Sequence, residues 1–304
     1  MSVQFCDLSL IIVSWNTRDL LDACLASVYA GSGSLALEIF VVDNASSDGT
    51  TDMVAEKYPQ VRLIRNTNNP GFAAANNQAI AQAAGECVLL LNPDTLVLED
   101  ALSRLVQYLR AHPAVGAVAP QVLNPDGSPQ PSWNNAFPGI FNEVFAGFVP
   151  GWLHPRRTVA VDRARIAEET GRTFPTGWLG GVCLMVRQSV IAQVGLMDDG
   201  YHMYSEETDW CFRMKKTDWE RHHVGDARII HYGGQSSKQV NLPMFFELHK
   251  SKYRYFRKHH GFLYAAAYKI LLLGGAALRF LIYRGRHSNE AERYRYIMRR
   301  LLAG

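Results

Sequence analysis

Polar side chains follow three apolar runs of the chain, at the points where those runs end. The run at residues 88–91 stops at Asn92 and Asp94, the run at 39–42 stops at Asp43, and the run at 8–13 stops at Ser14. If these runs are parallel strands, their carboxyl ends meet at the edge of the sheet where ligands bind. A carboxylate there can hold a hard divalent cation that bridges diphosphate oxygens. The pattern predicts a nucleotide-sized crevice around Asp43 and Asp94, with turn and N-cap roles as the structural alternative for each.

Three acids open a predicted helix that follows residue 205. Glu206, Glu207 and Asp209 would complement the helix dipole, and Asp209 can pair with Arg213 one turn later, so a structural account exists. Aromatic and apolar neighbours, among them Trp210, would desolvate these carboxylates and raise a carboxyl pKa towards the range of a general base. The pattern therefore favours a catalytic base here over a purely structural role.

His231 stands at the end of a predicted strand at residues 227–231 and precedes Tyr232 and two glycines. A neutral imidazole at such a strand end is a plausible metal ligand. A structural or exposed histidine is the alternative, and the local pattern taken alone favours it.

Strand and helix patterns alternate from residue 8 to about residue 120. Apolar residues recur at helical spacing in 17–29, 50–58, 73–84 and 99–112, and apolar runs with strand character lie between these segments. Such alternation predicts right-handed crossovers and a mostly parallel sheet covered on both faces, a Rossmann-like α/β fold. G-x-G-x-x-G and P-loop sequences are absent, which argues against dinucleotide and P-loop binding. Residues 120–175 are rich in Pro, Gly, Trp and Phe, and we expect them to include a mobile loop over the site.

Composition indicates a globular protein of a reducing compartment. The 304 residues are 48% hydrophobic, enough for a large core. The five cysteines are an odd number without C-x-x-C spacing, so we expect free thiols that serve as small core residues, and no zinc site. Asp7 precedes a first apolar run that is too short for a signal peptide, which predicts that this run belongs to the mature fold.

Charge divides the chain into an acidic body and a basic tail. Residues 250–304 hold 13 Lys or Arg and 2 Asp or Glu, a net +11, so the other residues carry −8 of the overall +3. A basic tail of this kind is predicted to meet an anionic surface. Residues 261–283 are apolar except for Lys269 and Arg279. This apolar content is too high for a segment that only binds the phosphates of a nucleic acid. We therefore expect a membrane surface and no nucleic acid.

The same apolar segment fits a helix that lies in the membrane interface. A spanning helix would bury Lys269 in hydrocarbon. At about 100° per residue, the step from Lys269 to Arg279 brings both cations to one side of a helix. An in-plane amphipathic helix is therefore the favoured prediction, and a helix packed on the catalytic domain or on a partner subunit is the alternative.

Taken together, these motifs resemble those of family 2 glycosyltransferases with the GT-A fold, in particular the bacterial rhamnosyltransferase-like branch. The resemblance covers about residues 7–238. It rests on SLIIVSWN at 9–16, VVDNASSDGT at 41–50, NPGFAAANN at 69–77, LLNPD at 90–94 and MYSEETD at 203–209, followed by His231. We expect a GT-A catalytic domain at residues 1–240 and a C-terminal helical, membrane-associating segment at 241–304.

The resemblance implies roles for individual residues. Asp43 looks like the residue that recognises the nucleotide base, and Asn69 and Asn77 bound a stretch that looks like a wall of the nucleotide pocket. Glu207 matches the second acid of the family's E-D pair, which acts as catalytic base, with Glu where Asp is usual.

A metal site is implied in the same way. Asp94 looks like the last acid of the metal-binding D-x-D motif, whose first position is taken here by Asn92, a departure that lowers the local negative charge. His231 resembles the histidine that completes the metal site in some members. The implied cofactor is Mg²⁺ or Mn²⁺.

The implied activity is inverting transfer of a sugar to a hydroxyl of a glycan or polyprenyl-linked acceptor. The implied nucleotide-sugar donor is dTDP-L-rhamnose first and UDP-sugars next, and the setting is cell-envelope or surface-polysaccharide assembly. We expect a cytoplasmic protein, peripheral on the inner face of the cell membrane, and the pattern selects no oligomeric state. Two other classes stay open: a GT-A nucleotidyltransferase, although its usual Gly-rich basic loop is absent after residues 8–13, and a catalytically silent sugar-nucleotide-binding or lipid-binding protein.

Overall fold

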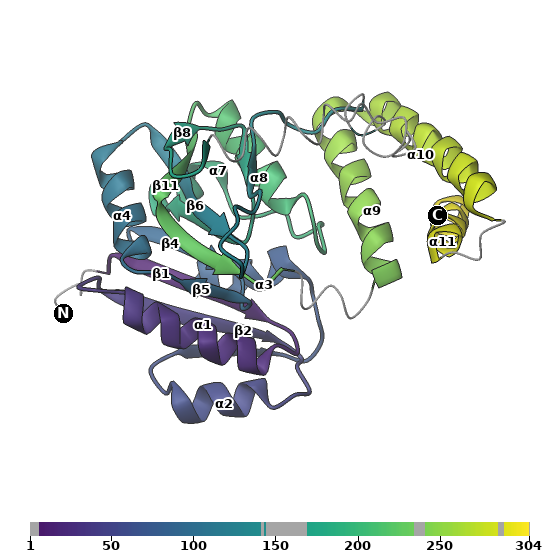
Figure 1. Ribbon diagram of the computed structural model, residues 1–304. Helices are drawn as coiled ribbons and strands as arrows, with labels where there is room; N and C mark the ends of the chain where they lie inside the picture. The colour runs from purple at the N-terminus through teal and green to yellow at the C-terminus, as the bar shows by residue number, and fades with distance from the viewer. Residues whose placement is uncertain (1–5, 141–142, 144–168, 234–240, 285–288, 304) are drawn as a thin grey trace. The chain divides into compact units, whose positions relative to one another are not determined.

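The computed structural model describes residues 6–140, 143, 169–233, 241–284 and 289–303, which belong to two compact units (Figure 1). The first unit comprises residues 1–137, 166–202 and 206–239, and the second comprises 138–165, 203–205 and 240–304. The assignment of 1–240 and 241–304 to two functional domains stays a prediction. The loop expected over the site falls largely on 144–168, outside the described residues.

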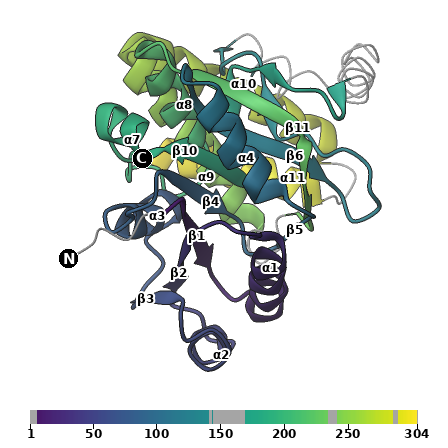
Figure 2. The same cartoon turned by 90° about the vertical axis from the view of Figure 1, so that its left-hand side faces the viewer.

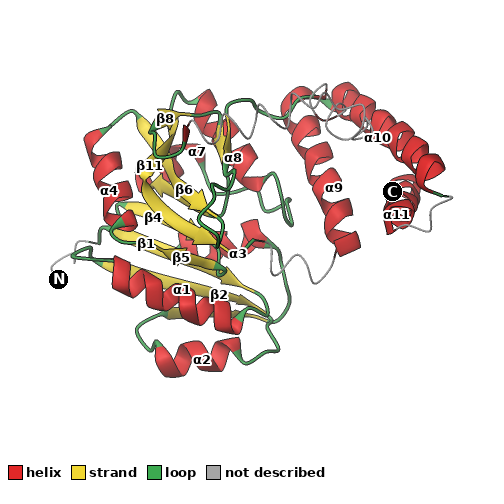
Figure 3. Ribbon diagram, viewed as in Figure 1, coloured by secondary structure: helices red, strands yellow, loops and turns green. Residues whose placement is uncertain are grey.

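A mixed, mostly parallel sheet forms the centre of the first unit (Figure 3). The strand order is β3-β2-β1-β4-β10-β6-β11-β5, with β8 paired to β11, and β7 and β9 form a separate pair. The strands are β1 (Leu8–Ser14), β2 (Leu37–Asn44), β3 (Arg62–Asn66), β4 (Cys87–Leu91), β5 (Thr95–Val97), β6 (Val115–Leu123), β7 (Trp133–Asn134), β8 (Phe174–Pro175), β9 (Trp178–Leu179), β10 (Cys183–Arg187) and β11 (Glu220–His231). The helices of this unit are α1 (Arg18–Gly31), α2 (Thr50–Lys57), α3 (Phe72–Ile80), α4 (Ala101–Ala111), α7 (Gln188–Val194) and α8 (Glu206–Lys216).

Helices cover both faces of this sheet because its central strands are apolar on both sides. In β1, Leu10 and Ile12 point into one core, which α1, α2 and α4 close. Ile11 points into a second core, which α3, α7 and α8 close. Figure 2 shows α1 and α3 on opposite sides of β1 and β2. The predicted α/β fold with a mostly parallel sheet is confirmed.

The carboxyl ends of β1, β2 and β4 meet at one edge of the sheet. β1 runs parallel to both of its neighbours, with Ser14 opposite Asp43 and Ile12 opposite Leu91. Asp43 and the turn that follows Leu91 therefore lie at the same end of the sheet.

Three strands differ from what the sequence pattern indicates. The pattern gives no sign of the short β5, which pairs antiparallel with β11. It also does not reveal that β10 runs antiparallel between β4 and β6. β11 begins at Glu220 rather than at residue 227, because its polar first half is hidden from a search for apolar runs. In that half, His222 is held by the hydroxyl of Tyr108 at 2.8 Å and by the carboxylate of Glu220 at 2.9 Å.

All five cysteines are free thiols, as the sequence predicts. Four of them are buried, and burial raises the pKa of Cys24 and of Cys87 to about 12. These thiols stay protonated at neutral pH and pack as small apolar side chains.

Three helices make up most of the described part of the second unit: α9 (Asn241–His260), α10 (Phe262–Tyr283) and α11 (Asn289–Ala303). One face of α10, which includes Ala265 and Ala276, is buried, and α9 and α11 both pack on this helix. Arg279 of α10 donates to the hydroxyl of Tyr294 on α11 at 2.7 Å and lies over its ring.

Another face of α10 is an exposed apolar stripe. It consists of Leu263, Ile270, Leu271, Leu278, Leu281 and Ile282. These positions recur at the spacing of one helix face, and none of them is charged. Among the described helices, α10 alone is long and apolar enough to cross a membrane by length and composition, a test that core helices of soluble proteins also pass.

Candidate active site

Asp94 and His231, far apart in the sequence, contact each other in the first unit. Asp94 follows β4, and the chain continues into β5, where Thr95 lies opposite His231 of β11. The backbone N–H of Tyr232 donates to the carbonyl of Asp94 at 3.0 Å. As a result, Asp94 Oδ1 lies 3.2 Å from His231 Nε2, and both side chains are buried.

Gln130 orients the His231 ring. Its Nε2 donates to Asn124 Oδ1 at 2.8 Å, so its Oε1 faces His231 Nδ1, at 2.5 Å. Because an amide oxygen only accepts, Nδ1 must carry the proton. The sequence gives no signal for Gln130, which lies in the segment expected to be irregular. Its position depends on the return of the chain along β6, where its N–H donates to the carbonyl of Val122 at 2.9 Å.

This arrangement can hold a divalent cation. With the proton on Nδ1, the lone pair of His231 Nε2 is available beside Asp94 Oδ1, and Nε2 makes no hydrogen bond with any described residue. Two lone-pair atoms this close are stabilised by a proton or a cation between them. No group of three or more His, Cys, Asp or Glu side chains that could form a closed metal cage occurs in the described parts of the chain, so the candidate site is a pair.

Asp43 is the last residue but one of β2, just before the loop that leads to α2, and is buried. Its Oδ2 accepts the N–H of Ser46 at 2.9 Å, which fixes the carboxylate against the loop that follows β2. Its Oδ1 is also buried and has no hydrogen-bond partner among the described residues. A buried carboxylate oxygen without a donor is costly, and a ligand N–H or O–H would satisfy it.

Asn69 and Asn77 form scaffolding hydrogen bonds. Asn69 Oδ1 accepts the side-chain amide of Asn44 at 3.2 Å and the N–H of Gly71 at 3.0 Å, which ties the end of β2 to the turn before α3. Asn77 uses its amide nitrogen and its amide oxygen on the backbone of Met197, at 2.8 and 3.1 Å. Their role as a wall of the nucleotide pocket stays a prediction.

Glu207 lies in the first turn of α8. The two residues before this helix, Tyr204 and Ser205, have positive φ angles of 70° and 66°, an uncommon conformation that is costly for residues with a Cβ. Glu207 is half-buried, and its Oε1 accepts the hydroxyl of Thr208 at 3.1 Å. Burial raises the pKa of the Glu207 carboxyl, and hydrogen bonds from its surroundings only partly oppose this.

The neighbouring acid Asp209 has a structural role. It is fully buried and accepts from Arg213 Nε at 2.9 Å, the i,i+4 pair that the sequence suggests. Arg213 also donates to the carbonyls of Val194 and Leu196, so the pair fastens α8 to the segment after α7.

Close backbone contacts bring the Glu207 segment to the strand ends. A Cβ on Gly181 would lie 3.9 Å from the Cβ of Glu207 and 3.5 Å from the ring of Phe72. The next residue, Val182, accepts the N–H of Asn92 at 2.9 Å, two positions before Asp94. Glu207 therefore lies at the same edge of the sheet as the Asp94 turn.

A second set of contacts joins the same segment to the Asn69 turn. The N–H of Phe72 donates to the carbonyl of His202 at 2.8 Å. Gly71 has a φ of +95°, and a Cβ there would lie 2.2 Å from that carbonyl oxygen, so only glycine fits. Through these contacts the structure gathers Asp43, Asp94, Glu207 and His231 around one end of the sheet.

The chain belongs to glycosyl transferase family 2. The family model matches residues 9–168, and the GT-A fold agrees with this membership. The mannosyltransferase PcManGT from Pyrobaculum calidifontis, whose structure contains GDP-Man and Mn²⁺, is 19% identical with a TM-score of 0.59, over 99% of this chain and 86% of that one.

Curated relatives include two rhamnosyltransferases. The N-acetylglucosaminyl-diphospho-decaprenol L-rhamnosyltransferase of Mycobacterium tuberculosis is 32% identical over 90% of this chain and 91% of its own length. The rhamnosyltransferase WbbL of Escherichia coli K12 is 24% identical over 61% of this chain and 69% of its own length. The predicted membership of the glycosyltransferase family is therefore confirmed.

Proposed function

We propose that this protein transfers L-rhamnose, with inversion, from dTDP-L-rhamnose to a hydroxyl of a lipid-linked glycan. The observation that carries the proposal is the position of Glu207. Its Cβ lies beside Gly181, next to Val182, which accepts the N–H of Asn92 before Asp94, and its carboxyl is desolvated. An acceptor hydroxyl there would have a base on one side and the donor diphosphate on the other. The sugar and the acceptor follow the mycobacterial rhamnosyltransferase, to which 90% of this chain aligns.

Asp94 and His231 would hold the divalent cation. The imidazole in this donor set favours Mn²⁺ over Mg²⁺. Two protein ligands suit the task, because such cations are often bound by one or two side chains together with substrate phosphates. When bound, the cation neutralises the charge that develops on the departing diphosphate.

Glu207 acts as the general base. Its carboxylate takes the proton of the acceptor hydroxyl, whose oxygen bonds to the anomeric carbon. The bond from that carbon to the diphosphate oxygen breaks on the opposite face, so the configuration inverts and the diphosphate leaves with the electron pair. Because burial raises the pKa of Glu207, its carboxylate is a stronger base than that of an exposed glutamate.

Replacing Asp43 with Asn should weaken nucleotide binding. The amide oxygen of the variant can still accept the N–H of Ser46. Its amide nitrogen would then stand where Oδ1 stands in wild type, so the nucleotide base would meet a donor in place of an acceptor. A hydrogen bond to a charged group contributes about 1.5–3 kcal/mol, so calorimetric titration with dTDP should give a Kd about 10- to 100-fold higher. Asp52→Asn, the same charge change at an exposed position of α2, is the control. If the two variants bound dTDP with equal affinity, Asp43 would not be a nucleotide-binding residue.

Replacing Gln130 with Leu should weaken Mn²⁺ binding without removing a metal ligand. The variant loses the acceptor that holds the proton on His231 Nδ1. Removing the hydrogen-bond partner of a histidine that binds a metal typically lowers the metal affinity about 10- to 100-fold. Mn²⁺ titration in the presence of dTDP should show this loss, and Gln130→Glu, which keeps an acceptor, should restore most of it. An unchanged Mn²⁺ affinity of the Gln130→Leu variant would show that Gln130 does not support the metal site.

A location at the inner face of the cell membrane would bring the protein to a lipid-linked acceptor. The second unit offers an exposed apolar stripe on α10, and residues 250–304 carry a net +11. An in-plane helix with such a stripe and basic flanks is the arrangement that anionic membranes bind. The protein is therefore placed, as part of this proposal, in the cytoplasm and peripheral on the membrane.

A donor panel tests the proposed function. The purified full-length protein with Mn²⁺ and a synthetic N-acetylglucosaminyl-diphospho-lipid should release dTDP from dTDP-L-rhamnose and form a product of inverted anomeric configuration. UDP-sugars and GDP-mannose are the competing donors. Turnover only with another donor would overturn the choice of rhamnose. Tight nucleotide-sugar binding without release of any nucleoside diphosphate would instead indicate a catalytically silent binding protein.

A further inference from the structure

The turn that leads into α8 is strained. Tyr204 and Ser205 have positive φ angles of 70° and 66°, and both residues carry a Cβ. Backbone of this kind persists only where surrounding contacts hold it, and it is common at active sites. The proposed base, Glu207, is the second residue of the helix that follows. The contacts that hold this turn therefore also set where Glu207 lies.

One of these contacts comes from Ser251 of α9. Its hydroxyl donates to the carbonyl of Met203, the residue before the strained pair, at 2.7 Å, and the serine is buried. Residues 203–205 and α9 belong to the same unit. Serine is not a strong helix former, and within a helix its hydroxyl often bonds a carbonyl one turn earlier. Here it reaches a residue 48 positions away, which indicates that this serine serves the turn.

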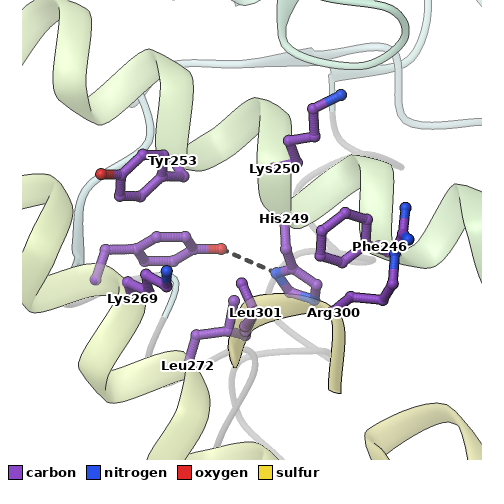
Figure 4. A pocket seen from close by; sticks show the side chains of 9 residues that line it. Phe246, His249, Lys250, Tyr253, Lys269, Leu272, Arg300 and Leu301 are labelled. Carbon is purple, nitrogen blue, oxygen red and sulfur yellow. Dashed lines mark hydrogen bonds between the residues drawn. The ribbon is translucent and has the colours of Figure 1, made fainter. Parts of the chain in front are cut away.

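Other contacts fix α9 on either side of Ser251 in the sequence. His249 bonds the hydroxyl of Tyr268 on α10 at 2.9 Å, and Figure 4 shows this hydrogen bond. Lys252 pairs with Glu143 at 2.5 Å. Positions two apart on a helix point to nearly opposite sides, so the side of α9 that bonds α10 through His249 is not the side that bears Ser251. The helix is therefore a firm support for the hydroxyl that bonds the turn.

The chain is held at the residue before Met203 as well. The carbonyl of His202 accepts the N–H of Phe72 at 2.8 Å. Two successive carbonyls are thus fixed immediately before the strained pair. Without the Ser251 hydroxyl, the Met203 carbonyl would be released, and the strained residues could relax toward negative φ. That change would rotate the start of α8 and move the side chain of Glu207.

We propose that Ser251 is a positioning residue for the general base: its hydroxyl holds the strained turn at residues 203–205, so that Glu207 faces the acceptor hydroxyl. This inference rests on the proposed function, because it requires Glu207 to be the base. The second unit would then contribute to catalysis in addition to membrane attachment.

Kinetics of full-length variants test this role. Ser251→Ala removes the hydroxyl, and Ser251→Thr keeps it. A double variant combines Ser251→Ala with Ser205→Gly, because glycine adopts positive φ without steric cost and should need less support. Ser189→Ala, at an exposed position of α7, is the control. Turnover is measured as nucleoside diphosphate release with the donor that the panel above selects, donor affinity by calorimetric titration, and folding by melting curves.

We expect Ser251→Ala to lower kcat about 10- to 100-fold, the scale of a small misplacement of a catalytic group, and to leave donor affinity unchanged. The Thr variant and the double variant should each recover most of this loss, and Ser189→Ala should behave as wild type. A kcat of Ser251→Ala equal to that of wild type, an equal loss of donor affinity, or failure of both the Thr and the double variant to recover kcat would overturn the proposal.

The Glu207→Gln variant separates this failure from failure of the proposed function. If it is impaired while Ser251→Ala is not, only the role of Ser251 is wrong. If it turns over normally, Glu207 is not the base, and the role of Ser251 falls with it. Absence of turnover by wild type with every donor would overturn the proposed function and this inference together.

Discussion

Replacing Glu207 with Gln lowers kcat by about 100- to 10,000-fold, the usual contribution of a general base, and leaves donor affinity nearly unchanged. The glutamine keeps the shape of the side chain at the start of α8 but cannot accept the acceptor's proton. Turnover is measured as nucleoside diphosphate release, and donor affinity by calorimetric titration. Binding should survive because the donor contacts assigned here, Asp43, Asp94 and His231, lie outside α8.

The matched control is Glu56→Gln, the same substitution at an exposed position of α2. It should behave as wild type. Normal turnover by the Glu207 variant would move the base elsewhere, with the buried Glu206 as the next residue to test, since Asp209 is bound to Arg213. A parallel loss of donor binding would indicate a role of Glu207 in holding the substrate.

The same variant should alter how stability depends on pH. Burial raises the folded-state pKa of Glu207 above that of the unfolded chain, so the unfolded state releases this proton first. The carboxyl therefore lowers the free energy of unfolding as pH rises from the unfolded pKa through the folded pKa. Glutamine does not ionise, so the melting temperature of the variant minus that of wild type should increase as pH rises above about 4, the pKa of a glutamate in the unfolded chain. A constant difference would contradict the desolvation of Glu207.

Replacing Asp94 with Asn lowers kcat/KM by about 100- to 1,000-fold, a typical loss when one stabiliser of developing charge is removed. The substitution takes away the carboxylate that lies 3.2 Å from His231 Nε2 and thus the charged half of the cation site. Mn²⁺ titration in the presence of dTDP should show a matching loss of metal affinity. Asp100→Asn, the same change at an exposed position before α4, is the control.

Two results would contradict this role of Asp94. One is an Asp94 variant whose activity still rises with Mn²⁺ as in wild type, which would place the cation elsewhere. The other is wild-type activity that survives removal of divalent cations by a chelator, which would leave stabilisation of the diphosphate to protein side chains alone.

The local sequence pattern predicts the positions of those site residues that lie at or just after the end of an apolar strand. β4 begins at Cys87 and ends at Leu91, as the pattern indicates, and the position of Asp94 follows from it. The position of Asp43 follows from β2 in the same way. In both cases the side chain is at the sheet edge because its strand ends there, which needs no knowledge of distant partners.

Other parts of the site depend on pairings that a local pattern does not contain. His231 contacts Asp94 because β5 pairs antiparallel with the end of β11, and β5 is too short to detect as an apolar run. Gln130 reaches His231 only because the chain turns back after β6. The hold of Asn77 on Met197 spans 120 positions of the sequence. Each of these contacts is set by tertiary structure.

A crystal structure of the Glu207→Gln protein with Mn²⁺ and dTDP-L-rhamnose tests most directly whether the four residues form one site. We expect an anomalous Mn²⁺ peak coordinated by Asp94 and His231, the nucleotide base against Asp43, and the anomeric carbon facing residue 207 with room for one hydroxyl between them. A donor bound with its diphosphate away from Asp94, or with its anomeric carbon turned from residue 207, would contradict this expectation.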